Sequence, residues 1–365
     1  PASKLDIKLA LEADDTETIH AALALKPRYN FEIIRVPPSP LRTKPKACNY
    51  ALRFARGEYV TVFDADDRPE PTQLKKAVLA FRTLPPDVAC LQARLNYYNS
   101  DANWLTRFFS LEYTVLFHFL LYGLDKLGIP IPLGGTSNHM ALKKLKELGE
   151  WDPFNVTEDA DLGTRLAASG FKTAMLDSYT LEEAPEGVGM WLRQRSRWIK
   201  GYMQTWLVHM RRPRVLLIRL GWRGFLGFQC FVGLPGFAFL TAPVVWALPL
   251  LWLFGLVKAG PAFPAWLIGL MVANLLLNLF TQWYTTLFCA LLYRKERVRM
   301  VVAGALYPLY LFLHSLASYK ALWQLAVKPH FWEKTAHAGL KSASSLTGEL
   351  LVRRGKPLTE AGAIG

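Results

Sequence analysis

From residue 5 to residue 210, short apolar and β-branched runs alternate with longer segments in which apolar residues recur every three or four positions. Runs of the first kind are typical of strands, and spacing of the second kind is typical of helices. The expected strands cover residues 5–11, 31–36, 59–63 and 89–97, and the expected helices between them cover residues 16–25, 44–52 and 74–81. This alternation predicts an α/β fold with a mostly parallel sheet covered by helices on both faces.

Three more helices are expected further along. Residues 105–124 are apolar and aromatic but are interrupted by charged residues, which predicts a long amphipathic helix, buried or interfacial, rather than a membrane span. Two other helices are expected over residues 157–168 and 189–210. The glycine-rich stretch 134–138 is either a plain turn or a place where the backbone approaches a ligand closely.

After Arg223 the pattern changes to long apolar runs. Residues 224–256 contain no charged residue, which no soluble loop or ordinary helix explains. Two further apolar runs follow, over residues 263–293 and 301–316. Each of the three is long enough, or nearly so, to cross a bilayer as a helix, so a membrane region is expected.

The number of crossings stays open from the sequence. Basic loops stay in the cytoplasm, so Arg223 and the basic loop 294–299 imply two crossings between them. A single third span would then leave the C-terminus outside. A hairpin divided at Pro243 would instead place the basic loop on the wrong side.

The composition of the chain also supports association with a membrane. The 365 residues are 52% hydrophobic and 20% charged, and they carry a formal net charge of +14, which would suit nucleic acid or an anionic membrane surface. The basic residues crowd the flanks of apolar runs and do not alternate with aromatics as in single-strand-binding proteins, which favours the membrane. The four cysteines form no C-x-x-C pair, which argues against a zinc site or a disulfide framework and fits a reducing cytoplasmic face.

Three carboxylates, Asp64, Asp66 and Asp67, directly follow the strand expected over residues 59–63, and nearby prolines prevent that strand from continuing. In an open α/β sheet the carboxyl ends of the strands form the ligand crevice. Clustered carboxylates repel one another there unless a cation holds them, and aspartate oxygens suit Mg²⁺ or Mn²⁺ rather than zinc. The alternative is a solvated acidic turn.

Two further motifs lie at expected helix starts. Lys44 and Lys46 open one helix, and lysines and helix N-termini both favour phosphate, although a solvated basic turn would have the same sequence. Glu158 and Asp159 open another, where acids matched to the helix dipole are the plain alternative to a catalytic pair.

The helix expected over residues 189–210 carries a fourth motif. Gln194 and Arg197 share one face, as do Arg195 and Trp198. The arginines could be ordinary surface cations, but the adjacent Trp offers a flat apolar face on which a sugar ring can stack.

In this order, and followed by apolar spans, the motifs resemble those of the membrane-embedded family-2 glycosyltransferases that include cellulose and hyaluronan synthases. They are Asp14-Asp15, Asp64-Ala65-Asp66, Thr157-Glu158-Asp159 and Gln194-x-x-Arg197-Trp198. The resemblance covers residues 5–210 by motif and the remainder by architecture. It implies a GT-A (Rossmann-like) domain that transfers a sugar, with inversion, from a nucleotide-diphospho-sugar at the cytosolic face of a membrane.

The resemblance also implies roles for single residues. Asp159 would be the general base that takes the proton of the acceptor hydroxyl. Asp64 and Asp66 would bind the donor diphosphate through Mg²⁺ or Mn²⁺. The remaining contacts would be those of Asp14 or Asp15 with the nucleoside, Lys46 with the donor, Gln194 and Arg197 with the diphosphate, and Trp198 with the acceptor as its stacking floor.

The tail over residues 332–339 resembles the segment that closes over bound nucleotide in these synthases. It implies a nucleotide contact for Thr335, a cytoplasmic tail and an even number of crossings. The expected organisation is a cytosolic domain over residues 1–210, interfacial and transmembrane helices over 211–327, and a cytosolic tail over 328–365 with a disordered end. The family's first strand is expected upstream of residue 1, together with part of the nucleotide pocket.

The expected activity is therefore the addition of a sugar, from a UDP-sugar as the expected donor, to a growing polysaccharide at a bacterial inner membrane. Single transfer to a lipid acceptor is the alternative within the same class. A hypothesis from another class is a membrane channel or transporter whose soluble part only senses nucleotide. No nucleic-acid partner is expected.

Overall fold

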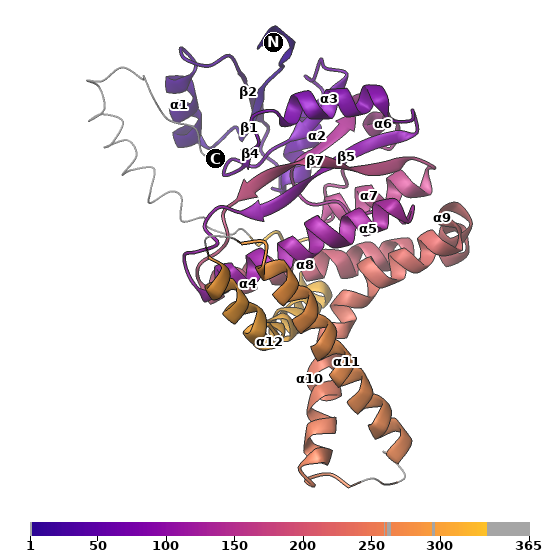
Figure 1. Ribbon diagram of the computed structural model, residues 1–365. Coiled ribbons are helices and arrows are strands. Elements are labelled where there is room, and N and C mark those ends of the chain that lie inside the picture. Colours follow the sequence, from indigo (N-terminus) through magenta and orange to yellow (C-terminus); the bar gives the residue numbers. More distant parts are fainter. Residues whose placement is uncertain (1, 259, 261–263, 294–295, 334–365) are drawn as a thin grey trace, which may run out of the picture.

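The computed structural model describes residues 2–258, 260, 264–293 and 296–333, with an α/β part followed by long helices (Figure 1). The strands are β1 (Lys8–Glu12), β2 (Glu32–Val36), β3 (Tyr59–Val62), β4 (Arg68–Pro69), β5 (Val88–Tyr97), β6 (Asn138–Ala141) and β7 (Lys172–Glu182). The helices of the α/β part are α1 (Thr16–Leu25), α2 (Lys44–Leu52), α3 (Gln73–Thr83), α4 (Trp104–Tyr113), α5 (Leu121–Lys126), α6 (Leu142–Glu147), α7 (Glu158–Ala168) and α8 (Val188–His209).

The predicted helices are confirmed, because local signals define them. Helix α1 begins after Asp15, whose carboxylate accepts a hydrogen bond from the backbone N–H of Thr18 at 3.1 Å. Helix α2 carries Pro45 in its first turn, where a missing N–H costs nothing. The helix expected over residues 105–124 is continuous from α4 to α5 through a π-helical stretch, Thr114–Leu120, and it packs into the core.

The prediction of a mostly parallel sheet holds only in part, because the sheet is mixed. The five-stranded sheet has the order β3-β6-β5-β7-β4, in which β3, β5 and β7 run in one direction and β6 and β4 in the other, so that β5 and β7 are its one pair of parallel neighbours. Strand β6 pairs antiparallel with β3 and β5 because the chain re-enters the sheet from the end at which β5 left it, after the detour through α4 and α5. Strands β1 and β2 form a separate parallel pair. Neither β6 nor β7 was expected from the sequence.

One apolar core joins α4 and α8 to the last helix, α12 (Arg297–Val327). Trp191 of α8 is fully buried, and its Nε1 donates a hydrogen bond to the Tyr310 hydroxyl of α12 at 2.9 Å. Arg195 of α8 pairs with Glu112 of α4 at 2.6 Å, and the Tyr310 hydroxyl donates to the same carboxylate at 2.9 Å. Burial alone would raise the pKa of Glu112, but the charge of Arg195 holds it at about 2, so the pair stays ionised. These contacts tie three helices together.

Helices α9 (Pro213–Phe228), α10 (Leu234–Leu253) and α11 (Ala265–Ala290) lie between α8 and α12. Helices α10 and α11 form a hairpin that projects away from the α/β part (Figure 1). Three stretches are long and apolar enough to cross a membrane, namely Pro213–Leu253, Ala265–Ala290 and Arg297–Val327. Helix α10 continues through Pro243, so a hairpin divided at that residue is excluded.

Candidate active site

A cleft of about 2410 Å³ runs along β1, α2, β3 and α3 and reaches the carboxyl ends of β3 and β7, where α7 and α8 bound it. Residues from three of the four sequence motifs line it, namely Asp64, Asp66, Glu158, Asp159, Gln194, Arg197 and Trp198. The tertiary structure therefore brings to one space side chains that are far apart in the sequence.

The carboxylates after β3 are held in a turn. Asp67 accepts a hydrogen bond from the backbone N–H of Asp64 at 2.7 Å and another from the Thr136 hydroxyl. Lys44 pairs with Asp64 and donates to the Gly135 carbonyl at 2.7 Å. Burial, with the charge of Asp64 in support, raises the pKa of Asp67 to about 6. Its Oδ1 is buried without a hydrogen-bond partner among the described residues, a position that a ligand would satisfy.

Glu182, the last residue of β7, adds another carboxylate to the same wall. Removal from water raises its pKa well above the ordinary value, and the charges of Asp67 and Asp64 act in the same direction. This excess of negative charge fits a divalent cation with oxygen ligands. Within the described ranges, no three His, Cys, Asp or Glu side chains are already gathered as a metal site, so ligand oxygens would have to complete the coordination shell.

Glu158 and Asp159 begin α7 beside the cleft. Glu158 is buried, whereas Asp159 is partly exposed, and its Oδ1 accepts the backbone N–H of Ala160 at 2.8 Å. Burial raises the pKa of both carboxyls, and the charges of Lys44 and Arg197 partly oppose this shift. A carboxylate with a raised pKa is suited to accept a proton near neutral pH.

Three side chains of α8 face the cleft opposite these acids. Gln194 is 7% exposed, and its Oε1 has no hydrogen-bond partner among the described residues. The Arg197 guanidinium lies 4.5 Å from the ring centre of Trp332 in the segment after α12. Trp198 is partly exposed and packs on Phe109, with ring centres 5.8 Å apart. This wall therefore offers a cation, an amide and an aromatic face.

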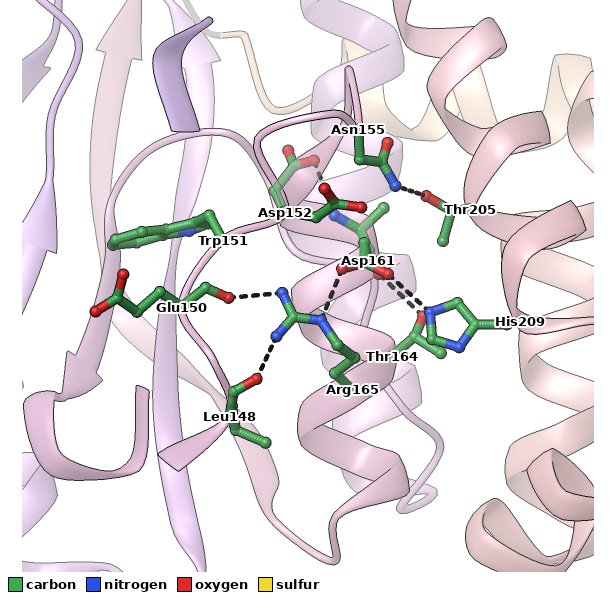
Figure 2. Close-up of polar contacts among 12 residues, drawn as sticks. Leu148, Glu150, Trp151, Asp152, Asn155, Asp161, Thr164, Arg165, Thr205 and His209 are labelled. Carbon is green, nitrogen blue, oxygen red and sulfur yellow. Dashed lines mark hydrogen bonds and ion pairs between the residues drawn. The ribbon is translucent and has the colours of Figure 1, made fainter. Parts of the chain in front are cut away.

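A polar network centred on the buried Asp161 joins α7 to α8 behind the cleft (Figure 2). The Asp161 carboxylate accepts hydrogen bonds from Arg165 Nε at 2.7 Å and from His209 Nε2 at 2.8 Å. Arg165 also donates to two carbonyls of the turn at 148–150, each at 2.7 Å. Because Asp161 lies two positions after Asp159, the network fixes the start of α7 against α8.

Two further contacts hold the same elements together. Asn155 Nδ2 donates to the Thr205 hydroxyl of α8 at 2.8 Å, as Figure 2 shows. Gly201 of α8 packs on Thr157, and a Cβ added at this glycine would lie only 2.4 Å from Thr157 Oγ1. The loop that leads to Asp159 is thus supported by the second half of α8.

Three other residues expected at the site contact neighbouring residues in the first part of the chain. Asp14 pairs with Arg42, Asp15 caps α1, and Lys46 pairs with Glu12 at 3.1 Å. Asp14, Asp15 and Lys46 are absent from the described residues that line the cleft, where Lys44 is the lysine beside Asp64. Thr335 lies outside the described residues.

Sequence reasoning missed Glu182 and the pairing of Lys44 with Asp64. Glu182 lies at the end of a strand, and a position at the end of a strand is also what identified Asp64. Apolar and polar residues do not alternate clearly over residues 172–182, however, so no strand was expected there. No sequence signal links Lys44 to Asp64, because the two belong to different elements that only the fold brings together.

The short segment 328–333 returns from α12 to the edge of the cleft. Lys200 of α8 is fully buried, and its Nζ donates to the Phe331 carbonyl at 2.7 Å. Glu333 pairs with Lys320 of α12 at 2.9 Å. These two anchors hold Trp332 over Arg197.

Most of the chain matches a known protein family. Residues 59–323 match a family model described as "Glycosyl transferase family group 2". The chain is 26% identical over 205 residues to the probable glycosyltransferase YdaM of Bacillus subtilis (strain 168), a match that covers 55% of this chain and 48% of that protein.

Two other proteins are similar over different lengths. The chain is 30% identical over 159 residues to the probable glucomannan 4-beta-mannosyltransferase 7 of Oryza sativa subsp. japonica, which covers 43% of this chain and 26% of that protein. It thus spans less than half the length of either curated relative. The solved structure of mannosyltransferase PcManGT from Pyrobaculum calidifontis in complex with GDP-Man and Mn²⁺ superposes with a TM-score of 0.53 and 19% identity, covering 89% of this chain and 79% of that one.

Proposed function

Because this chain belongs to glycosyl transferase family group 2, we propose that it transfers a sugar, with inversion, from a nucleotide-diphospho-sugar to a glycan or lipid acceptor. Its fold is the mixed α/β GT-A fold, as predicted. The observation that best supports this proposal is the cleft, in which Asp64, Asp159 and Arg197 from three separate elements face one space.

Asp64 and Asp66 would hold a divalent cation in this cleft. Two observations support a cation there: the Oδ1 of Asp67 has no hydrogen-bond partner among the described residues, and the charges of Asp67 and Asp64 add to burial in raising the pKa of Glu182. Carboxylate oxygens suit Mg²⁺ or Mn²⁺. When bound, such an ion would neutralise charge on the diphosphate leaving group. PcManGT, which shares the fold, was solved with GDP-Man and Mn²⁺.

Asp159 is the proposed general base. Its carboxylate would take the proton of the acceptor hydroxyl while that oxygen forms a bond to the anomeric carbon. The bond from this carbon to the diphosphate oxygen breaks, and its electron pair stays on the diphosphate. One displacement inverts the carbon, so no second carboxylate nucleophile is needed. Lys44 and Arg197 would stabilise the diphosphate charge, and Trp198 would stack against the acceptor ring.

The acceptor proposed first is a growing polysaccharide at the cytosolic face of a bacterial inner membrane, with a UDP-sugar as the donor. The match to a protein named as a glucomannan mannosyltransferase supports a polymer. A lipid acceptor is the second candidate, because Gly236 and Phe239 of α10 also line the cleft and connect it to the apolar helices. Product sizing would separate the two, since a polymerase makes a ladder and a single-transfer enzyme adds one sugar.

The turnover number is expected to rise with pH and then reach a plateau. Burial raises the pKa of Asp159 above its ordinary value of 3.8, and the base works only when deprotonated. Below that raised pKa the rate should therefore fall by about tenfold per pH unit, as for a single protonation. A pH profile of nucleotide release at saturating donor would measure this. A flat profile over the range in which the protein stays folded would contradict the role of Asp159.

Asp161→Asn is expected to lower the turnover number about ten- to a hundredfold while leaving the donor KM nearly unchanged. The variant weakens the network that holds α7 against α8 (Figure 2) and so displaces Asp159 without touching the substrate. Steady-state kinetics and thermal unfolding would be measured together.

His209→Gln serves as the matched variant for this prediction, because it removes the α8 side of the same link and leaves Arg165 in place. It should lower the turnover number in the same direction with the same KM. If both variants lose thermal stability while the turnover of the folded fraction is that of the wild type, the network supports folding alone.

The first test of the proposed function is nucleotide release by the full chain in membranes. A panel of UDP- and GDP-sugars would be offered with Mg²⁺ or Mn²⁺ and then with EDTA. Metal-dependent turnover of one donor would establish the transfer reaction and its sugar class. If the folded protein releases no nucleotide from any donor, even with added glycan and lipid acceptors, the channel or transporter hypothesis would be favoured.

A further inference from the structure

Helix α12 has the length and composition of a membrane span, yet its middle and the residues that flank both of its ends contact the α/β part. Just before the helix, the Tyr293 hydroxyl lies 2.7 Å from Thr114 Oγ1, in the segment between α4 and α5. Just after it, the Phe331 carbonyl accepts a hydrogen bond from Lys200 of α8 at 2.7 Å. In the middle, the Tyr310 hydroxyl donates to the carboxylate that α4 and α8 share as an ion pair.

These contacts are incompatible with a crossing. The hydrocarbon core is about 30 Å thick, so a spanning helix places its two ends about 30 Å apart along the membrane normal. Helix α8 would then have to cross beside it. Helix α8 carries Arg193, Arg195, Arg197 and Lys200 within eight positions and lines the polar cleft, which excludes it from the hydrocarbon core.

We infer that α12 lies in the interfacial layer of the leaflet next to the α/β part, with its outer face in the acyl-chain boundary. This inference rests on the proposed membrane location. Only α10 and α11 would then cross among the helices that the structure describes. In Figure 1, α12 lies along the base of the α/β part beside α4, whereas the α10–α11 hairpin extends away from both.

The two faces of α12 support this placement. The inner face is covered by protein, with Met300, Tyr310 and Ala317 buried. The outer face is an exposed apolar stripe along the whole helix, formed by Val298, Val302, Leu306, Leu309, Phe312, Leu316, Tyr319, Trp323 and Val327. Exposed cations, Arg297 and Lys328, lie at its two ends. An apolar stripe between terminal cations is typical of a helix that lies in the headgroup boundary.

The outer face of α12 is also continuous with the spanning hairpin. Phe312 of this face packs on Trp246 of α10, with ring centres 5.4 Å apart. Beside the face, the Thr286 hydroxyl of α11 donates to the carbonyl of the buried Gly304 at 3.2 Å. The lipid that surrounds α10 and α11 therefore reaches the stripe on α12 without a break. A bilayer leaflet is the occupant that fits this face.

Two crossings also resolve the conflict over topology in the sequence. Arg223, which precedes the hairpin, and Arg297, which follows it, then lie on one side of the membrane, as the positive-inside rule requires. The segment 328–333 lies on the same side, where it can reach Arg197 at the cleft.

Cysteine labelling of the full chain in sealed vesicles of known orientation tests the number of crossings. The exposed Cys230 is first replaced by Ser. Single cysteines then replace Arg299 and Lys328 at the two ends of α12, Leu256 beyond α10, and Glu147 on the α/β part as the reference. With a membrane-impermeant maleimide, Arg299→Cys and Lys328→Cys should react from the side of Glu147→Cys, and Leu256→Cys only from the other side.

Labelling of Arg299→Cys and Lys328→Cys from opposite sides would overturn the inference, and the proposed sugar transfer would stand. Labelling of all four positions from one side would overturn both the inference and the membrane location. Because sidedness is measured without turnover, an inactive preparation still answers the question.

Spin labels test the depth of α12 independently. Leu309 on α12 and Leu276 on α11 are equally exposed, at 62% and 61%, and form a matched pair. The label at Leu276 should collide often with oxygen and rarely with a polar nickel reagent. The label at Leu309 should give a lower ratio of oxygen to nickel collisions, which corresponds to a depth of a few ångströms below the headgroups. Equal depths would overturn the interfacial placement.

Discussion

Asp159→Asn is expected to lower the turnover number by about 10²- to 10⁴-fold, the usual contribution of a general base. Asparagine matches aspartate in size and can keep the hydrogen bond from the Ala160 N–H, which measures 2.8 Å, but it has no basic oxygen. Because Asp159 is proposed to act on the acceptor, the dissociation constant of the donor should change little. Nucleotide release under steady state and calorimetric donor binding would measure the two effects.

Asp177→Asn is the control for this variant, because its side chain is 87% exposed and pairs with Arg94 on the surface. It should keep the wild-type turnover. An Asp159→Asn protein with near wild-type activity would refute the proposed base and favour the channel or transporter hypothesis. Equal losses in donor affinity and in turnover would instead identify Asp159 as a donor contact.

Asp64→Asn is expected to lower kcat/KM at least about a hundredfold and to raise the Mn²⁺ or Mg²⁺ concentration needed for half-maximal activity. The variant removes one of the two carboxylates proposed to hold the ion. A metal titration of nucleotide release would show both effects, and EDTA should abolish wild-type activity.

Asp64 also pairs with Lys44, so a second variant separates the two roles. Lys44→Gln removes the pair but not the metal ligand. It should reduce turnover without shifting the metal titration. If Asp64→Asn and Lys44→Gln give the same titration as the wild type, Asp64 serves the ion pair and does not hold the metal.

The helices of the α/β part could be predicted because their signals are local. Asp15 caps α1 and Pro45 lies in the first turn of α2, and each acts within one turn of its own helix. Strand β6 carries no such signal. The sequence indicates a turn as far as Asn138, and the buried Asn138 and His139 form a strand because β3 and β5 pair with them on both sides.

The same distinction holds in the cleft. The acids after β3 and at the start of α7 could be identified, because the end of a strand and the start of a helix mark them in the sequence. Nothing local distinguishes Lys44 from Lys46, or Asp161 from any other acid on the surface of a helix. Lys44 is defined by its contact with Asp64, and Asp161 by its contact with His209, 48 positions away.

The sequence by itself determined the α/β class, the positions of the proposed base and metal ligands, and the presence of apolar helices, because periodicity, caps and composition act over a few residues. The tertiary structure determined that β6 is antiparallel to its neighbours, that Lys44 contacts Asp64, and that α12 lies beside the α/β part. That helix has the composition of a membrane span, and the contacts of Tyr310 in its middle and of the flanking residues Tyr293 and Phe331 hold it beside the α/β part. Contacts between distant segments depend on packing in three dimensions, which no local pattern encodes.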